Sequence, residues 1–433
     1  MSPNRLQVGI DFSQKRADFC LLFPDGQPLE LHRSFANSLS GYSQAQTFLL
    51  EALHTYPFDG VDVTGEATSY YWLPFFWQFA RDGEFACQDL RLFLLNPRWV
   101  HWFKRCFARD DKSDRKDSFY IAERTRTRPP TYTWGPQQDW LPLRFYTRLR
   151  FHLSQMLVRE KNFFLAYLFL RCSAYRIVRP FTNIFGLTSG QVLTEPPRLE
   201  ELASWSAEEL ADLLYEWSGH HLDDPLGHAQ KLQKALAESF PLEANLTQPL
   251  QRLLDLCMQN IRFFEAQIEQ VEQWIAAEVQ ACHPQILQLA TPRGVGLVYA
   301  AGIAAEIGDL ARFFQGQKWD RKHKRFRPKN LRDVEDALAK SAGLWWPRSS
   351  SGDFTAEDSR MAKTGNRYLR FYLIQAANGM RLHIPEYRRF YDRKYREVPK
   401  HQHKRALVLT ARKSVGLFVG LLHRNEAFRS KEA

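Results

Sequence analysis

The sequence predicts an α/β domain at the N-terminus followed by a mostly α-helical remainder. Up to about residue 125, short apolar runs of strand length alternate with segments of helical spacing. Beyond residue 140, apolar residues recur at helical intervals, and one segment repeats them in a regular heptad pattern. A chain of 433 residues is long enough for two or three domains, each with its own hydrophobic core.

Three strands are expected first. VGID (8–11) is typical of a buried strand, and ADFCLLF (17–23) is its hairpin partner. The Asp25-Gly26 pair predicts a turn before a third strand at QPLELHRSF (27–35).

Helices and strands then alternate. The expected elements are a helix at 41–56, a strand at VDVTGE (61–66), an apolar helix at 70–81 and a strand at LRLFLLN (90–96). This order is that of a ribonuclease-H-like domain. Doubly wound folds share much of it, so the pattern alone leaves both open.

A basic stretch follows from 140 to 194. Eight Lys or Arg residues stand against a single acid, Glu160. The alternative is a solvated basic face, but one sign maintained over this length favours binding of nucleic-acid phosphates. The eight residues are Arg144, Arg148, Arg150, Arg159, Lys161, Arg171, Arg176 and Arg179.

Helical signals dominate the rest of the chain. SAEE (206–209) is a capping box that starts an amphipathic helix. From about 286 the chain is helical and basic, with a Lys- and Arg-rich loop at 318–330. Between them lies a heptad seam, which could pack inside the chain but more often pairs two helices, as from two subunits. The seam consists of Leu250, Leu254, Cys257, Ile261, Phe264, Ile268, Val271 and Ile275.

The composition indicates a polyanionic partner, because the formal net charge is +11. Six scattered cysteines without a CxxC pair favour reduced thiols in a cytosolic protein. The N-terminus has no apolar signal segment, and the apolar run FFLAYLFL (163–170) is too short to span a bilayer. No membrane association is therefore expected.

Acidic residues stand where a ribonuclease-H-like fold would assemble a metal site. Asp11 ends the first expected strand, Glu66 ends the fourth, and Asp114 and Asp117 begin the helix after the fifth. Their i, i+3 spacing puts the two later aspartates on one helical face. Taken alone, Asp11 or Glu66 would be interpreted as an ordinary residue at the end of a strand. Together the four predict a Mg²⁺ site, because this ion prefers oxygen ligands.

The SSSG run (349–352) admits two interpretations. Serines beside a glycine are typical of a flexible linker. Here, however, the run lies between Arg348 on one side and Arg360, Lys363 and Arg367 on the other. A serine in such a setting could attack a phosphodiester and hold the DNA end as a phosphoserine, whose bond energy allows rejoining without ATP.

Both halves of the chain resemble the DEDD-type insertion-sequence transposases of the IS110 family, which includes bridge-RNA-guided recombinases. The N-terminal resemblance rests on GIDFS (9–13), GEAT (65–68) and KSDRKDSFYIAE (112–123). The C-terminal one rests on GVGLVYAAGIAAEIGDLARF (294–313), AGLWWPRSSSG (342–352), KTGNRYLRFYLIQAA (363–377) and ALVLTARK (406–413). The chain is longer than is usual for the family, and the extra length includes the basic loop at 318–330.

The resemblance implies a site and partners. The catalytic and metal-binding tetrad would be Asp11, Glu66, Asp114 and Asp117 on a RuvC-like fold with Mg²⁺ as cofactor. The nucleophile would be Ser351, with Ser350 as the fallback because a three-serine run leaves the register open. Implied partners are donor and target DNA, a structured noncoding guide RNA and further copies of the chain, as a dimer or tetramer joined by a coiled coil. The setting would be the bacterial or archaeal cytoplasm, at the nucleoid.

The resemblance and the charge together imply a domain plan and a set of nucleic-acid contacts. The expected domains are a RuvC-like domain with a basic helix (1–182), a helical linker with a coiled-coil oligomerisation segment (183–285), and a helical transposase domain carrying the serine (286–433). The expected contacts are Arg144, Arg148, Arg150, Arg159, Lys161, Arg348, Lys363, Asn366, Arg367, Arg412 and Lys413.

Two other functions use the same residues. A junction-resolving endonuclease would use the acids for hydrolysis with no covalent intermediate. A non-catalytic nucleic-acid-binding protein would use only the positively charged residues, to bind phosphates.

Overall fold

The computed structural model describes residues 4–106, 114–130, 133–135, 140–347, 350–351, 354–355, 361–362 and 364–429. The chain divides into two compact units. One consists of residues 1–138 with 309–337, and the other of residues 139–308 with 338–433.

The first unit contains a mixed sheet of five strands, which confirms the predicted α/β domain. The strands are β1 (Arg5–Phe12), β2 (Arg16–Leu22), β3 (Pro28–Ala36), β4 (Gly60–Glu66) and β5 (Leu90–Leu95). Their order across the sheet is β3-β2-β1-β4-β5. β1 and β2 pair antiparallel, as do β2 and β3, whereas β4 runs parallel to both β1 and β5.

Helices flank this sheet. They are α1 (Leu39–Thr55), α2 (Leu73–Arg81), α3 (Gly83–Ala86), α4 (Pro97–Lys104) and α5 (Asp114–Thr127). The helix expected at 70–81 begins three residues late, at Leu73, next to a proline in its first turn and after Ser69, whose φ is +52°. Proline is favoured in the first turn because the N–H it lacks would have no helical partner there.

α5 packs closely against β1, and this contact fixes the position of the helix on the strand. A Cβ atom on Gly9 of β1 would lie 2.1 Å from the carbonyl oxygen of Ser118 and 2.4 Å from the amide nitrogen of Ala122, both in α5. Only glycine leaves room for the helix backbone at this point. Ser118 and Ala122 are buried at the contact.

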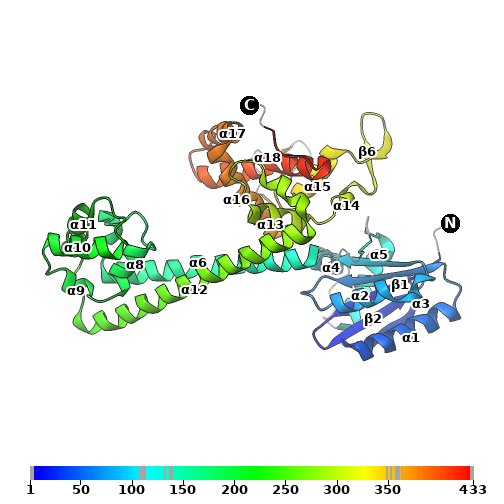
Figure 1. Ribbon diagram of the computed structural model, residues 1–433. Coiled ribbons are helices and arrows are strands. Elements are labelled where there is room, and N and C mark those ends of the chain that lie inside the picture. The colour runs from blue at the N-terminus through cyan, green and yellow to red at the C-terminus, as the bar shows by residue number, and fades with distance from the viewer. Residues whose placement is uncertain are drawn as a thin grey trace. The chain divides into compact units, whose positions relative to one another are not determined.

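The second unit is built on two long helices that lie side by side, α6 (Trp140–Arg171) and α12 (Ala244–Cys282) (Figure 1). They are antiparallel, because Trp140 stacks on His283 at one end while Glu160 accepts a hydrogen bond from Asn260 farther along. The predicted heptad seam belongs to α12, one of the two helices of this pair. Of its eight residues, all but Phe264 and Ile268 are buried. The helix that α12 packs against here belongs to the same chain, so the alternative of packing inside the chain holds for the described residues.

Short helices cover the turn between α6 and α12. They are α7 (Tyr175–Val178), α8 (Leu187–Thr194), α9 (Leu199–Leu202), α10 (Ala207–Trp217) and α11 (Pro225–Ala237). Their core includes Phe164, Leu168, Tyr175, Leu214 and Leu254. The predicted capping box is present at α10: Ser206 accepts from the Glu209 amide, and Glu209 accepts from the Ser206 amide.

The remaining helices are η1 (Pro284–Ala290), α13 (Leu297–Ile307), α14 (Ala311–Phe314), α15 (Leu331–Ser341), α16 (Arg367–His383), α17 (Pro385–Arg396) and α18 (Gln402–Arg424). α13 packs on both α6 and α16, and α16 packs on α17 and α18. α18 is long and apolar enough by composition to cross a membrane, which was not expected from the sequence. Half of its most apolar stretch is buried, as in the core helix of a packed unit.

Two short strand pairs complete the structure. β6 (Gln317–Asp320) and β7 (Arg325–Pro328) form an antiparallel hairpin where the sequence suggested a basic loop. β8 (Ser350–Ser351) pairs with β9 (Phe354–Thr355). The six cysteines, all within the described part of the chain, are thiols and form no disulfide with one another.

Candidate active site

Two of the predicted acids stand at the same edge of the sheet. Asp11 lies at the end of β1, and Glu66 is the last residue of β4. β1 and β4 are parallel neighbours with Ile10 opposite Gly65, so the next residues along, Asp11 and Glu66, come side by side. The hydroxyl of Thr68 donates to Glu66 Oε1 at 3.1 Å.

The third acid comes from α5. Asp117 directly precedes Ser118, whose carbonyl oxygen lies against Gly9 of β1, so the close approach of helix and strand brings Asp117 to Asp11. Lys104, the last residue of α4, forms an ion pair with Asp117, with 2.7 Å between Nζ and Oδ1. Lys104 could not be identified from the sequence, because nothing in its local pattern shows which carboxylate it meets.

The three carboxylates act on one another electrostatically. Burial raises the pKa of Asp11 to about 6, and the negative charges of Asp117 and Glu66 contribute to this rise in pKa, while Lys104 opposes it. The raised pKa means that the ionised form of Asp11 is disfavoured, first by its loss of hydration and then by the two neighbouring negative charges. The structure therefore brings Asp11, Glu66 and Asp117 near one another, and their role as a metal site stays a prediction.

The fourth acid, Asp114, begins α5, but its side chain lies outside the part of the chain that the structure describes. Among the described side chains, no group of three His, Cys, Asp or Glu residues is arranged to hold a metal ion. The described acids still fit a divalent cation, because carboxylate oxygens are its preferred ligands and their mutual repulsion is what a cation would relieve.

The predicted serines lie in β8, which consists of Ser350 and Ser351 and pairs with β9. Their side chains, and the predicted contacts Arg348 and Lys363, lie outside the described residues. The base of this segment is well defined. The Ala362 amide donates to the Trp345 carbonyl at 3.0 Å, and the Asn366 amide donates to the Ser341 carbonyl at 2.7 Å. Backbone bonds therefore hold the two ends of the serine-bearing segment together.

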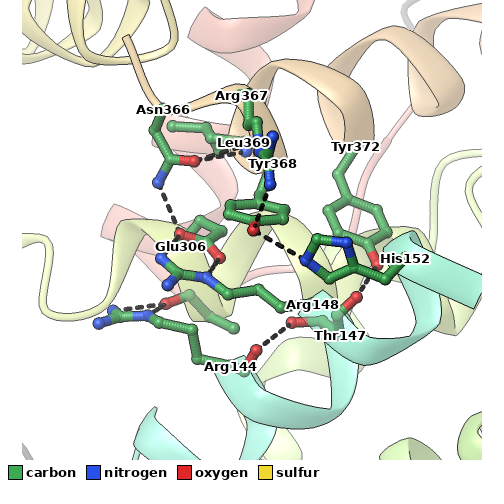
Figure 2. Close-up of polar contacts among 11 residues, drawn as sticks. Arg144, Thr147, Arg148, His152, Glu306, Asn366, Arg367, Tyr368, Leu369 and Tyr372 are labelled. Atoms are coloured by element: carbon green, nitrogen blue, oxygen red, sulfur yellow. Dashed lines mark hydrogen bonds and ion pairs between the residues drawn. The ribbon is translucent and has the colours of Figure 1, made fainter. Parts of the chain in front are cut away.

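A buried carboxylate, Glu306 of α13, ties this base to the long helix α6 (Figure 2). Arg148 donates to both of its oxygens, at 2.7 and 2.9 Å, and the side-chain Nδ2 of Asn366 donates to Oε2 at 2.6 Å. The side-chain oxygen Oδ1 of Asn366 caps α16 by accepting from the backbone amides of Tyr368 and Leu369. Burial favours a higher pKa for Glu306, but the hydrogen bond and charge of Arg148 hold this pKa below its usual value.

Several residues expected to contact nucleic acid have partners inside the chain. Arg144 donates two hydrogen bonds to the Ala305 carbonyl, at 2.9 and 2.7 Å. The ion pairs, besides Arg148 with Glu306, are Arg150 with Glu272, Lys161 with Glu265 and Lys413 with Glu386. The acidic partners lie on other helices, which is why the basic stretch at 140–194 looked unbalanced in charge.

The other predicted contacts are more open. Arg367 is exposed and lies over the rings of Phe151 and Tyr368. Arg159 is exposed beside Phe163, and Arg412 is half-buried. Nucleic-acid binding by these residues stays a prediction.

Two regions of the chain match models of known protein families. Residues 8–170 match the DEDD-type IS110 model, described as a transposase. Residues 329–392 match a model described as the transposase IS116/IS110/IS902 family. Together the matches cover more than half of the 433 residues and include Asp11, Glu66, Asp117 and the serine segment. A comparison with curated proteins gives no match.

Proposed function

This chain belongs to the IS116/IS110/IS902 family of transposases and is a DNA transposase, and we propose that it cuts and rejoins the strands of an insertion sequence through a serine nucleophile supported by a carboxylate metal site. The observation that carries the proposal is the meeting of Asp11, Glu66 and Asp117, which accompanies a rise in the pKa of Asp11 to about 6. We assign the N-terminal domain a RuvC-like fold on the same ground.

The metal would be Mg²⁺, held by the carboxylates of Asp11, Glu66, Asp114 and Asp117. When bound, it would supply positive charge against the charge that develops on the phosphate during transfer. Thr68 orients Glu66 through its hydroxyl, and Lys104 holds Asp117. Displacement of Lys104 from Asp117 would free that carboxylate for the cation and leave an ammonium group to neutralise a DNA phosphate.

The serine step is a transfer between two phosphate esters. The hydroxyl oxygen of Ser351, or of Ser350 as the fallback, attacks a DNA phosphorus and forms a serine–phosphate ester. The bond from phosphorus to one deoxyribose oxygen breaks, and that oxygen leaves as a hydroxyl carrying the proton that serine gives up. Rejoining reverses this exchange, with the hydroxyl of another DNA strand as attacker and serine as leaving group.

The fixed base of the serine segment supports this role. A nucleophile must be held close to its phosphate in a defined direction, and loose attachment costs rate. Trp345, Ala362 and Asn366 close the segment by backbone bonds, and Glu306 joins Asn366 to Arg148 of α6.

We also propose that the chain works as a dimer or tetramer. Leu149, Met156, Phe163 and Leu170 recur every seven residues along α6 and expose 43%, 48%, 44% and 55% of their surface. Residues seven apart lie on one face of a helix, and an apolar seam of this kind pairs with another helix in a coiled coil. α12 covers a different face of α6, so a second copy of the chain could cover this one.

Guidance by a structured noncoding RNA is proposed from the family resemblance and from the net charge of +11. An RNA that pairs with donor and target DNA would relieve the protein of reading bases directly. Purification with RNA retained, followed by sequencing of that RNA, tests this part.

The decisive experiment looks for a covalent protein–DNA band after incubation with element-end DNA, the retained RNA and Mg²⁺, followed by denaturation. Ser351→Ala, Ser350→Ala and Asp114→Ala are compared with wild type. A band that is lost in Asp114→Ala and in one serine variant is expected. Cleavage without any band, lost only in Asp114→Ala, would instead identify a metal-dependent endonuclease.

A further inference from the structure

The β6–β7 hairpin is a feature that the family matches do not cover. Its strands, Gln317–Asp320 and Arg325–Pro328, lie between the matched ranges 8–170 and 329–392. Trp319 pairs directly with Phe326 across the two strands, and Lys318 pairs with Arg327. Neighbouring residues on a strand face opposite sides, so the aromatic pair and the basic pair lie on opposite faces of the hairpin.

The basic face is anchored. Asp333, in the first turn of α15, is buried and accepts from Lys318 Nζ and Arg327 Nη1, both at 2.6 Å. Its carboxylate also accepts from the Asn330 amide at 3.0 Å. Hydrogen bonds from Arg327 and Lys318 hold the pKa of Asp333 far below its usual value, so this anchor persists throughout the neutral range. The opposite face is therefore held in a fixed orientation.

That opposite face carries two exposed aromatic rings. Trp319 exposes 48% of its surface and Phe326 exposes 63%. The ring centroids are 5.0 Å apart in an edge-to-face arrangement. Large aromatic side chains held in water on a short ribbon contribute little to a core, but their flat faces can stack on nucleotide bases.

The tip of the hairpin adds exposed cations. Arg321, Lys322, Lys324 and Arg325 are all exposed, and in the described part of the chain no acid is paired with any of them. The one acid at the tip, Asp320, is occupied by its own turn: it accepts from the Lys322 amide at 3.0 Å and meets His323 Nδ1 at 2.7 Å. The arginines Arg148 and Arg150 of α6, in contrast, have acid partners.

We propose that the β6–β7 hairpin binds an unpaired stretch of the DNA substrate, with Trp319 and Phe326 stacking on bases and the tip cations contacting phosphates. DNA is the substrate of the family, and stacking requires bases whose faces are not covered by neighbours in a duplex. A purely phosphate-binding hairpin would need the cations alone, so the exposed aromatic pair favours a single strand.

Binding of labelled oligonucleotides by the full-length chain tests the proposal. Bound nucleic acid is first removed at high salt, and fluorescence anisotropy is measured with single-stranded DNA, the matching duplex and single-stranded RNA. Trp319→Ala with Phe326→Ala removes the stacking pair. The matched control is Phe240→Ala, which removes an aromatic residue that is 80% exposed outside the hairpin.

A variant that neutralises the cations at the hairpin tip tests their contribution to DNA binding. Arg321, Lys322, Lys324 and Arg325 are each replaced by Gln, and the control neutralises two exposed lysines of α11, Lys231→Gln with Lys234→Gln. Cross-linking to DNA that carries iodouracil, mapped by mass spectrometry, reports directly on the peptide that contains Trp319 and Phe326. Thermal unfolding checks that every variant keeps its fold.

We expect the aromatic variant to bind single-stranded DNA about tenfold more weakly or worse, with a smaller effect on the duplex. The charge variant should lower the slope of log affinity against log salt by about 0.7 for each DNA phosphate that the tip no longer neutralises. Wild-type affinity in both variants would overturn the proposal, as would equal losses on duplex and single strand, or tighter hairpin-dependent binding of RNA than of DNA. The assay needs no cleavage, so its outcome is independent of the serine mechanism.

Discussion

The guanidinium of Arg148 in α6 donates to both carboxylate oxygens of Glu306 in α13, at 2.7 and 2.9 Å. Glu306 is buried, with only 1% of its side chain exposed. Its third bond, from Asn366, reaches the residue that caps α16 and closes the serine segment. One buried acid thus joins three helices far apart in sequence, at the place where the proposed nucleophile is attached.

Glu306→Ala is expected to lower the free energy of unfolding by about 3–5 kcal/mol, because it leaves Arg148 half-buried without its partner. Replacing both residues together, Arg148→Met with Glu306→Leu, should lower the free energy of unfolding by clearly less. Urea denaturation monitored by circular dichroism measures both. Glu265→Ala, which removes the partner of Lys161 in a more exposed pair, serves as the control and should cost no more than about 1 kcal/mol. A double variant as unstable as Glu306→Ala would contradict this explanation.

The Arg148–Glu306 pair also shows which contacts could not be predicted from the sequence. The strands that carry Asp11 and Glu66 near their ends could be predicted, because strand periodicity and order are local signals. The partners of Arg148, Arg150 and Lys161 could not, because the acids that neutralise them lie more than a hundred residues away. The heptad pattern of α12 predicted a packed face, but nothing in it specified that α6 would cover that face. The hairpin at 317–328 was missed because its short strands carry charges rather than an apolar alternation.

The raised pKa of Asp11 predicts a pH-dependent effect on stability. The folded-state pKa is about 6, above the ordinary value of 3.8, so the fold favours the protonated carboxyl. As the pH rises from the lower value through the higher one, the folded protein loses stability relative to the unfolded chain, and the loss persists at neutral pH. Asp11→Asn should therefore raise Tm by roughly 2–4 °C near neutral pH and change it little at about pH 4.

Scanning calorimetry at the two pH values, with and without Mg²⁺, measures this effect. The cation should raise the Tm of the wild type at neutral pH and raise that of Asp11→Asn much less, because a bound ligand stabilises only the fold that binds it. Asp25→Asn is the control, since Asp25 accepts a turn hydrogen bond from the Gln27 amide that asparagine can also accept. A Tm increase of equal size at both pH values would show that ionisation of Asp11 is not the cause.

Gly9 offers a geometric test of the carboxylate site. In Gly9→Ala the new methyl group would lie 2.1 Å from the Ser118 carbonyl, so α5 must move away from β1 and carry Asp117 with it. We expect a loss of about 1–3 kcal/mol in stability and a larger loss of metal-dependent cleavage. Gly83→Ala is the matched control, because no atom beyond its chain neighbours and its own helix backbone lies within 4 Å of the position its methyl group would take. Normal cleavage by Gly9→Ala would mean that Asp117 is not positioned by this contact.

The exposed seam of α6 predicts the state of assembly. Met156→Glu places a charge in the middle of the face formed by Leu149, Met156, Phe163 and Leu170. A buried charge without a partner is costly, so the substitution should shift a dimer or tetramer toward monomer at micromolar concentration. Light scattering coupled to size-exclusion chromatography measures the mass directly. Gln155→Glu adds the same charge at the neighbouring exposed position, on a different face of the helix, and should leave the mass unchanged. If Met156→Glu assembles as the wild type does, another surface must join the subunits, because a helix seam cannot stay closed around an uncompensated carboxylate.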